Sequence, residues 1–221
     1  MANDPRTILI GDVHGCIDEL QDLLREVGFV PGEDRVVLVG DLVAKGPDSQ
    51  AVVQLCRERG FEAVLGNHDA FLLRIREGEP MKKPPKKSHL DAAAAMRAED
   101  WAYLEALPLW RRLEGFVVVH GGLVPGVPLE EQQRDDCLNM RSIREDGTAS
   151  ARIEEGAAWA SLWPGPEHVV FGHDAVRGLQ RHAHATGLDS GCVYGRALSA
   201  LVLPEQRLVQ VPARRAWTPI D

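Results

Sequence analysis

Five short polar motifs, each bordered by glycine, are spread along the chain. They read GDVHG (11–15), GD (40–41), GNHD (66–69), HGG (120–122) and GHD (172–174). Carboxylate, imidazole and amide oxygen are ligands that suit Mn²⁺, Fe, Zn²⁺, Co²⁺ or Mg²⁺, and the motifs contain no thiolate. The sequence therefore predicts a metal centre, with candidate ligands Asp12, His14, Asp41, Asn67, His120 and His173.

Each of these residues has a structural alternative when it is taken alone. An aspartate after a strand is often a helix N-cap, and an asparagine beside glycine is often a turn residue in the left-handed region. Five separate motifs would each have to imitate a ligand by chance, however. Their coincidence favours a shared site over five unrelated structural roles.

The elements that position these motifs alternate between strand and helix in the first third of the chain. We predict strands at 7–10, 35–39 and 61–65, and helices at 16–27, 49–59 and 69–76. Three successive strand–helix units predict parallel strands joined by right-handed crossovers. Ligands bind outside the carboxyl ends of such strands, so the motifs are expected to meet at one rim of the sheet.

The second half of the chain has a different pattern. Short strands are predicted at 116–119, 168–171, 192–194, 198–203 and 208–211, with hairpin connections at 194–196 and 204–206. Residues 79–88 carry four lysines and three prolines and predict a loop, and residues 89–107 predict an alanine-rich helix. The fold class is α/β (α+β), with a mixed sheet or sandwich flanked by helices, and we expect residues 1–221 to form one domain that includes the insertion at 79–107.

The composition is that of an ordinary globular protein, with 221 residues, 44% hydrophobic and 26% charged. The formal charge of −8 speaks against stable nucleic-acid binding, which needs a basic surface. The N-terminal residues do not resemble a signal peptide, and no apolar run is long enough to span a membrane. We expect a cytoplasmic protein whose cysteines are structural thiols: Cys16, Cys56, Cys137 and Cys192. The sequence does not predict an oligomeric state.

The order of the motifs GDVHG, GDLV-x-KG, GNHD, VVHGGL and FGHD resembles the calcineurin-like metallophosphoesterases, in particular their phosphoprotein-phosphatase branch. The resemblance runs from residue 10 to about residue 203. GDLVAKGPDS, LGNHDAFLL, NMRS and ATGLDSGCVYG are similar to the symmetrical bis(5'-nucleosyl)-tetraphosphatases and their shorter ApaH-like relatives. The resemblance implies a central β-sandwich flanked by helices.

The resemblance also implies roles for the candidate residues. One ion would be held by Asp12, His14 and Asp41, and a second by Asp41 with the remaining three ligands Asn67, His120 and His173. Mn²⁺ is the first expectation for both ions, with Co²⁺, Fe, Zn²⁺ and Mg²⁺ as alternatives. Such a pair lowers the pKa of a bridging water, and the hydroxide attacks phosphorus. His68 would be the general acid for the leaving oxygen.

The chain departs from the protein Ser/Thr phosphatases at two places. Ala44-Lys45 stands where those enzymes carry Asp-Arg, and Leu65 stands where many of them carry arginine. The missing aspartate would orient the general acid; either Asp69 replaces it, or His68 works without that support. Lys45 offers a point charge in place of a bidentate guanidinium. Arg141 is the candidate for a remaining phosphate clamp, and a solvated surface arginine is its alternative interpretation.

These departures favour a dinucleoside polyphosphate as the substrate, such as diadenosine tetraphosphate cleaved symmetrically to ADP. Phosphoproteins, small phosphomonoesters such as aryl phosphates, inorganic polyphosphate and capped RNA remain alternatives within the enzyme class, and a non-catalytic binding module is the alternative outside it. The lysines of the 79–88 loop could contact polyphosphate, although a solvated loop is the simpler interpretation; they are Lys82, Lys83, Lys86 and Lys87. Asp174 and Asp189 are predicted to orient metal-bound histidines. The histidines outside the motifs are predicted to be structural or on the surface: His89, His168, His182 and His184.

Overall fold

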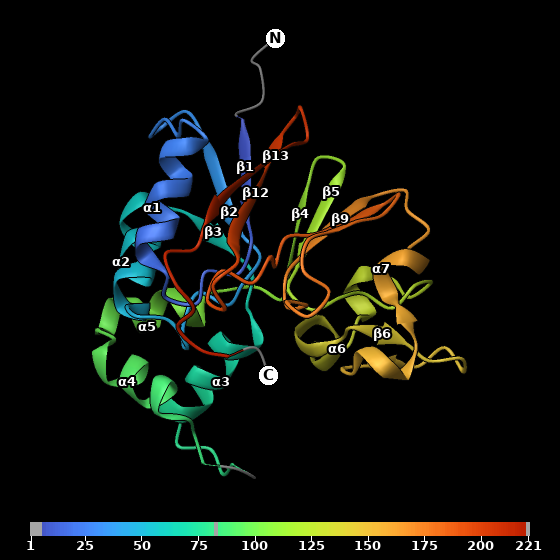
Figure 1. Ribbon diagram of the computed structural model, residues 1–221. Helices are drawn as coiled ribbons and strands as arrows, with labels where there is room; N and C mark the ends of the chain where they lie inside the picture. Colours follow the sequence, from blue (N-terminus) through green and yellow to red (C-terminus); the bar gives the residue numbers. More distant parts are fainter. Residues whose placement is uncertain (1–5, 82–83, 220–221) are drawn as a thin grey trace.

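Two β-sheets packed face to face form the centre of the protein in the computed structural model, which describes residues 6–81 and 84–219 (Figure 1). The strand order is β13-β12-β1-β2-β3 in the first sheet and β10-β11-β9-β5-β4 in the second. Helices cover the outer face of each sheet, so the strands are enclosed between apolar layers. This arrangement confirms the predicted α/β fold class and the sandwich.

The first sheet begins with the predicted strand–helix units. β1 (Thr7–Ile10), β2 (Arg35–Leu38) and β3 (Glu62–Ala63) are parallel neighbours in sequence order, as predicted. The crossovers between them are α1 (Ile17–Glu26) and α2 (Ser49–Arg59). Two antiparallel strands complete the sheet on the other side of β1, namely β12 (Ala197–Leu203) and β13 (Arg207–Pro212), which are joined by the predicted hairpin.

The second sheet contains three parallel strands with an antiparallel strand at each edge. β5 (Phe116–Val119), β9 (His168–Phe171) and β11 (Ala185–Gly187) are the parallel strands. The edge strands are β4 (Trp110–Leu113) and β10 (Gln180–Arg181). Its outer face carries short elements: η1 (Leu129–Glu131), α6 (Arg134–Asn139), β6 (Ser142–Ile143), β7 (Ala149–Ser150), η2 (Ile153–Glu155), β8 (Ala157–Ala158) and α7 (Trp159–Leu162).

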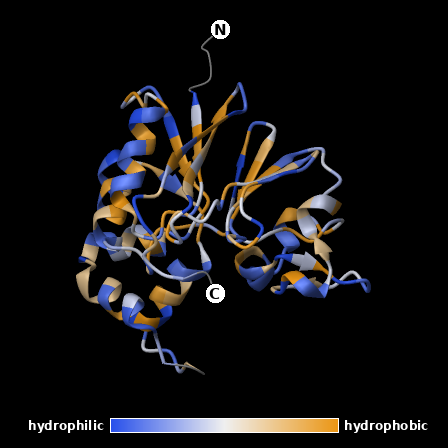
Figure 2. Cartoon of the chain, in the orientation of Figure 1, coloured by the Kyte–Doolittle hydropathy of each residue, from blue (hydrophilic) through white to orange (hydrophobic). Residues whose placement is uncertain are grey.

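The apolar residues of the central strands divide between two layers because successive side chains of a strand point to opposite faces. Leu9 and Val37 of the first sheet pack against Val118 and Val170 of the second. Their neighbours in sequence face outward, and Ile8 packs into the layer under the helices. The central strands are mostly hydrophobic (orange in Figure 2), as expected of strands buried on both faces.

The part of the chain that connects β3 of the first sheet to β4 of the second differs from the prediction. The single helix expected at 89–107 is two helices, α4 (Lys87–Ala95) and α5 (Ala98–Glu105). The break occurs because Asp100 is fully buried and its carboxylate accepts the Arg97 backbone N–H, which starts a new helix. Lys82 and Lys83 of the predicted loop lie outside the described residues.

Two further boundaries were predicted wrongly. The strand expected at 192–194 is a turn held by the Tyr194 N–H to Gly191 C=O bond. Helix α3 (Asn67–Arg76) begins two residues earlier than predicted, so Asn67 and His68 lie in its first turn. No helix in the described part of the chain has the length and apolar character needed to cross a membrane.

Candidate metal centre

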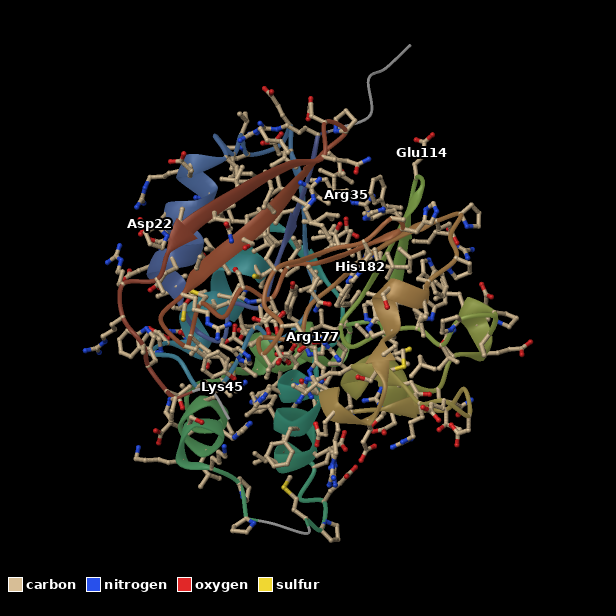
Figure 3. All side chains as sticks on the ribbon, turned by 45° about the vertical axis from the view of Figure 1, so that its right-hand side comes forward. Asp22, Arg35, Lys45, Glu114, Arg177 and His182 are labelled. Carbon is tan, nitrogen blue, oxygen red and sulfur yellow. The ribbon has the colours of Figure 1, made fainter. Side chains whose placement is uncertain are left out.

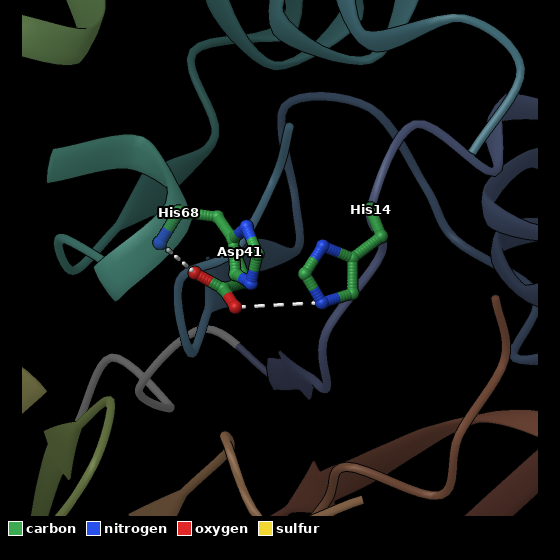
Figure 4. Close-up of side chains that lie close together, drawn as sticks. All are labelled: His14, Asp41 and His68. Atoms are coloured by element: carbon green, nitrogen blue, oxygen red, sulfur yellow. Dashed lines mark hydrogen bonds and ion pairs between the residues drawn. The ribbon is translucent and has the colours of Figure 1, made fainter. Parts of the chain in front are cut away.

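Strands from both sheets bring the predicted ligands together. Asp12 and His14 follow β1, Asp41 follows β2, and His120 and His173 follow β5 and β9. The Asp41 carboxylate lies between two imidazoles. Its Oδ2 is 3.4 Å from His14 Nε2 (Figure 4), and its Oδ1 is 3.4 Å from His120 Nε2. A carboxylate that faces a histidine on each side has the position of a bridging ligand.

The amide of Asn67 completes the second half of the cluster. Its Oδ1 lies 2.9 Å from His120 Nε2 and 3.1 Å from His173 Nδ1. Three potential ligand atoms from α3, the loop after β5 and the loop after β9 therefore converge. The carboxylate of Asp12 lies within 4.8 Å of the ligand atoms of Asp41 and His120.

Each of the three imidazoles is held by its other ring nitrogen. His14 Nδ1 lies 3.0 Å from the Val43 carbonyl oxygen, and His120 Nδ1 lies 2.9 Å from the Val39 carbonyl oxygen. His173 is reversed, because its Nε2 lies 3.0 Å from the Asn139 carbonyl oxygen. Donation to a carbonyl fixes the tautomer and leaves a lone pair on the nitrogen that faces the cluster.

The backbone of the centre is strained. Among the described residues, six that are not glycine have a positive φ, and five of them lie here: His14, Asp41, Ala44, Lys45 and His173, with φ between 48° and 68°. Such residues adopt this region only when the surrounding structure holds them there, and they cluster at functional sites.

Two glycines allow the loops to approach the carboxylates closely. A Cβ atom on Gly172 would overlap Asp12 Oδ1, and one on Gly66 would overlap the backbone N and the Oδ1 atom of Asp41. Both positions exclude any side chain. The glycines that border the motifs are thus required by packing against the ligands themselves.

The charges of the centre fit divalent cations. Asp12 is 3% exposed, and among the described residues the His173 backbone N–H is the sole hydrogen-bond donor to its carboxylate. Burial and the nearby Asp189 raise the pKa of Asp12. Burial also disfavours the Asp41 carboxylate, but His120 and the other imidazoles outweigh it and hold the Asp41 pKa well below its usual range. Buried carboxylates of this kind are paired or coordinate metals, and the oxygen and imidazole donors suit borderline divalent ions.

His68 is positioned directly beside the cluster. Its backbone N–H donates to Asp41 Oδ1 at 2.8 Å (Figure 4), and its ring lies edge-on to the His14 ring at 5.0 Å. Burial lowers the pKa of His68 well below its ordinary value, although Asp41 opposes this shift.

The prediction that Asp69 orients the His68 ring is wrong. Asp69 is fully buried, and its two carboxylate oxygens accept backbone N–H groups of Asp41, Leu42 and Gly66 at 2.9 to 3.0 Å. The carboxylate is therefore turned toward the loop after β2. The partner of His68 is His89, whose Nε2 lies 2.9 Å from His68 Nδ1.

Lys45, labelled in Figure 3, reaches the centre from the loop after β2. Its Nζ donates to Tyr194 Oη at 2.8 Å and lies 3.1 Å from His14 Nε2. Burial opposes its positive charge, but Asp41 and Tyr194 outweigh burial and raise the Lys45 pKa. A retained ammonium at this point adds positive charge beside the candidate ligands.

Arg141 is fixed by the backbone. Its guanidinium donates to the carbonyl oxygens of Ala151 at 3.0 Å and His173 at 3.1 Å. Its Nε atom is buried without a hydrogen bond and lies 3.9 Å from Asp174 Oδ1. Arg141 is thus a held group that lines the cavity at the metal centre, and the alternative of a solvated surface arginine does not hold.

The predicted roles of Asp174 and Asp189 are also wrong, because backbone carbonyls orient the histidines. Asp174 instead accepts from Arg177 Nη1 at 2.6 Å; Arg177 is labelled in Figure 3. Asp189 accepts the Gly191 backbone N–H at 3.1 Å. Burial raises the pKa of Asp189 to about 6.

Two hollows meet at the cluster. A cavity of about 120 Å³ is lined by the candidate ligands together with Lys45, Arg141 and Tyr194. A groove of about 1160 Å³ shares Lys45, Asn67 and His68 with this cavity, and its lining also includes Phe71 and Trp217.

Three of the residues described above were not predicted to take part in the site. His89 is 5% exposed and contacts His68, although the sequence indicated a structural or surface role. Tyr194 lies in the GCVYG segment, which is part of the family resemblance, so it could have been proposed as a site residue from the sequence. Trp217 follows the last strand and comes near α3 only through the path of the C-terminal segment.

Known proteins share both the sequence and the fold. The calcineurin-like phosphoesterase family model matches residues 5–198. A symmetrical bis(5'-nucleosyl)-tetraphosphatase from Aromatoleum aromaticum is 31% identical, with 92% of this chain and 96% of the relative covered. One from Edwardsiella ictaluri is also 31% identical, with coverage of 95% and 97%.

A solved structure described as a candidate diadenosine tetraphosphatase superposes with a TM-score of 0.88 at 43% identity, and the alignment covers 96% of this chain and 95% of that one. The family model covers most of the chain and includes all six candidate ligands. The protein belongs to the calcineurin-like phosphoesterases, a family of metal-dependent phosphoesterases.

Proposed function

We propose that this protein hydrolyses dinucleoside polyphosphates and cleaves diadenosine tetraphosphate symmetrically, with one water, into two molecules of ADP. The observation that carries this proposal is the groove that adjoins the metal centre at Asn67 and His68 and is also lined by Phe71 and Trp217. The relatives named symmetrical tetraphosphatases, which match over nearly their whole length, support the same substrate.

The groove offers what a nucleotide needs. The rings of Phe71 and Trp217 supply aromatic surface for a base, although the Arg215 guanidinium already lies over the Trp217 ring, 3.7 Å from its centroid. Lys86 and Arg134 line the same groove and supply positive charge for phosphate oxygens. Arg74 also lines it, but its guanidinium is paired with Glu79 at 2.6 Å. A single phosphorylated side chain would fill only the end of the groove nearest to His68.

The six candidate ligands would hold two divalent cations, with Asp41 shared between them, and Mn²⁺ is our first choice for both. Such ions supply Lewis acidity, which neutralises charge on a phosphoryl group and activates water. Lys45 and Arg141 border the cavity at the ligands, so both would hold the oxygens of the phosphoryl group under attack.

His68 would donate a proton from Nε2 to the leaving phosphate oxygen. The ring lines both the cavity and the groove, so it stands where the two parts of a cleaved chain separate. Burial lowers its pKa, whereas a bound polyphosphate brings negative charge that favours the protonated ring. The four cysteines are free and buried, which fits the reducing cytoplasm that we propose as its location.

The test compares diadenosine tetraphosphate, a phosphopeptide and inorganic polyphosphate at matched concentrations with enzyme reconstituted with Mn²⁺. We expect kcat/KM at least tenfold higher for the dinucleotide, a preference of about 1.4 kcal/mol, and ADP as the sole nucleotide product. Preference for the phosphopeptide would overturn the substrate assignment. A mixture of AMP and ATP as products would keep the substrate but overturn the symmetrical cleavage.

A further inference from the structure

His68 has one side-chain hydrogen-bond partner among the described residues, and that partner is a second histidine from a different helix. His68 Nδ1 lies 2.9 Å from His89 Nε2. The two ring planes are parallel within 8°, yet the ring centroids are 5.1 Å apart. With the nitrogens so close, rings at this separation lie edge to edge in nearly one plane, so the hydrogen bond is close to linear.

We propose that His89 is a positioning residue that holds the His68 imidazole with its Nε2 atom directed to the leaving oxygen of the substrate. This inference rests on the general-acid role of His68 in the proposed function. It also assigns a role to α4, which lies in the connection between β3 and β4. The first turn of this helix places His89 at the edge of the metal centre.

The general-acid role of His68 determines which of the two histidines donates the hydrogen bond between them. A histidine that donates from Nε2 and is left neutral must keep its other proton on Nδ1. That Nδ1–H needs an acceptor, and the lone pair of His89 Nε2 is in place to be one. His89 must then be neutral with its own proton on Nδ1. Burial, and after it the ammonium of Lys45, lower the pKa of His89 and so favour the neutral ring.

The surroundings fix His89 itself. The residue is 5% exposed, and the ring of Phe71 meets its ring edge-on with the centroids 4.7 Å apart. Its Nδ1 atom is buried and has no hydrogen-bond partner. A packing role alone would be served by an apolar ring, and burying an unpaired imidazole nitrogen costs free energy. A histidine at this position is explained if its Nε2 atom accepts a hydrogen bond from His68.

Among the described residues, the side chains that the sequence suggested for this role do not fill it. The Asp69 carboxylate is turned to the loop after β2, and Ala44 offers no polar side-chain atom. Lys45 is a donor and cannot accept the Nδ1–H.

The first experiment reads the hydrogen bond without turnover. Nitrogen-15 NMR of the histidine rings, on protein loaded with diamagnetic Zn²⁺, is expected to show a proton on His68 Nδ1, and an unprotonated Nε2 with a protonated Nδ1 on His89. The substitution His89→Phe keeps a packed ring without nitrogen and should shift the His68 Nδ1 resonance. A proton on His89 Nε2, or His68 signals that are the same in both proteins, would overturn the proposal.

The second experiment measures kcat and KM on phenyl phosphate and nitrophenyl phosphate. A phenolate leaves poorly, with a phenol pKa of about 10 as in tyrosine, so it needs the proton more than nitrophenolate does. We expect His89→Phe to lower kcat about 10- to 100-fold on phenyl phosphate, less on the nitrophenyl ester, with KM and metal affinity unchanged. His89→Gln, which returns an acceptor near the position of Nε2, should recover part of the loss.

Equal losses on the two esters, or no loss, would overturn the positioning role. His68→Ala separates this failure from that of the proposed function. If that variant keeps the wild-type kcat on both esters, His68 is not the acid, and the positioning proposal falls with it even where the NMR spectra show the hydrogen bond. If His68→Ala loses about 10²- to 10⁴-fold while His89→Phe loses nothing, the acid stands and the positioning role alone is overturned.

Discussion

Asp69 holds the backbone of Asp41 in its strained conformation. Asp69 Oδ2 accepts the Asp41 N–H at 2.9 Å, and Oδ1 accepts those of Leu42 and Val43 at 3.0 and 3.3 Å. Asp41 has a φ of 52°, which non-glycine residues rarely adopt. The position of the Asp41 carboxylate between His14 and His120 thus depends on a fully buried acceptor that belongs to another element, α3.

Asp69→Asn tests this dependence. An amide offers one acceptor oxygen and turns an NH₂ group toward the remaining backbone N–H groups, so at least one buried donor loses its partner. We expect the free energy of unfolding to fall by about 2–4 kcal/mol and the metal affinity to fall at least tenfold. Urea denaturation and metal titration measure these two changes.

Asp48→Asn is the matched control. Asp48 caps α2 by accepting the Ala51 N–H at 2.9 Å, and asparagine caps a helix about as well. We expect this variant to keep its stability within about 0.5 kcal/mol. If Asp69→Asn kept both stability and metal affinity and lost only kcat, Asp69 would act on the chemistry rather than on the Asp41 loop.

Gly172→Ala should damage the metal centre more than the fold. The added Cβ atom would overlap Asp12 Oδ1, so the carboxylate must move out of the position it shares with the other ligands. We expect metal affinity to fall at least tenfold, measured by titration calorimetry of the metal-free protein. The contrast is Gly28→Ala, where φ is 64° and nothing lies within 4 Å. That change should cost about 1 kcal/mol of stability through backbone strain and leave metal affinity intact.

Lys45 provides the third prediction. Its ammonium is held by Tyr194 Oη and lies next to His14 Nε2, so Lys45→Met should remove a charge from the phosphate position while keeping the length of the side chain. We expect kcat/KM on the polyphosphate substrate to fall about 10- to 100-fold, on the scale of one charged hydrogen bond. Tyr194→Phe keeps the ammonium and should lose less than Lys45→Met. Equal losses in the two variants would indicate that Lys45 acts through its bond to Tyr194 rather than on phosphate.

The candidate ligands could be predicted from the sequence because each lies in a glycine-bordered motif that follows a short apolar strand. Leu9 and Val37 could be recognised as strand residues from their apolar neighbours alone. The partners of the side chains were harder to predict. Asp69 stands next to His68 in sequence, yet in the first turn of a helix adjacent side chains point about 100° apart, and its carboxylate faces the loop after β2.

His89 shows why the remainder of the site was not predicted. It lies 21 residues after His68, beyond a proline- and lysine-rich segment, in a run of alanines without a motif. Its contact with His68 depends on how α4 packs against α3, which local propensity does not determine. The break between α4 and α5 has the same origin, since Asp100 is buried by its tertiary contacts with Gln50 and Arg57.

Acid stability offers a test far from the metal centre. Arg6 Nε donates to Asp34 Oδ1 at 2.9 Å, and the same guanidinium donates to the Gly28 carbonyl oxygen at 2.8 Å. The Val30 N–H also donates to Asp34 Oδ2 at 2.8 Å. The bond from Arg6 holds the pKa of the Asp34 carboxyl below its ordinary value of 3.8, although burial opposes the shift.

Because the folded pKa of Asp34 is the lower one, the unfolded chain binds more protons at pH values between the two pKa values, and stability decreases as the pH is lowered through that range. The contribution is therefore complete above about pH 4 and is lost as the pH falls through the folded pKa. We expect Asp34→Asn to cost about 1 kcal/mol at pH 7, a modest value because Arg6 is partly exposed, and to cost less at pH 2.5. Urea denaturation of both proteins at the two pH values measures the difference. A gap between them that is as wide at pH 2.5 as at pH 7 would mean that the ionised carboxylate of Asp34 is not what stabilises the fold.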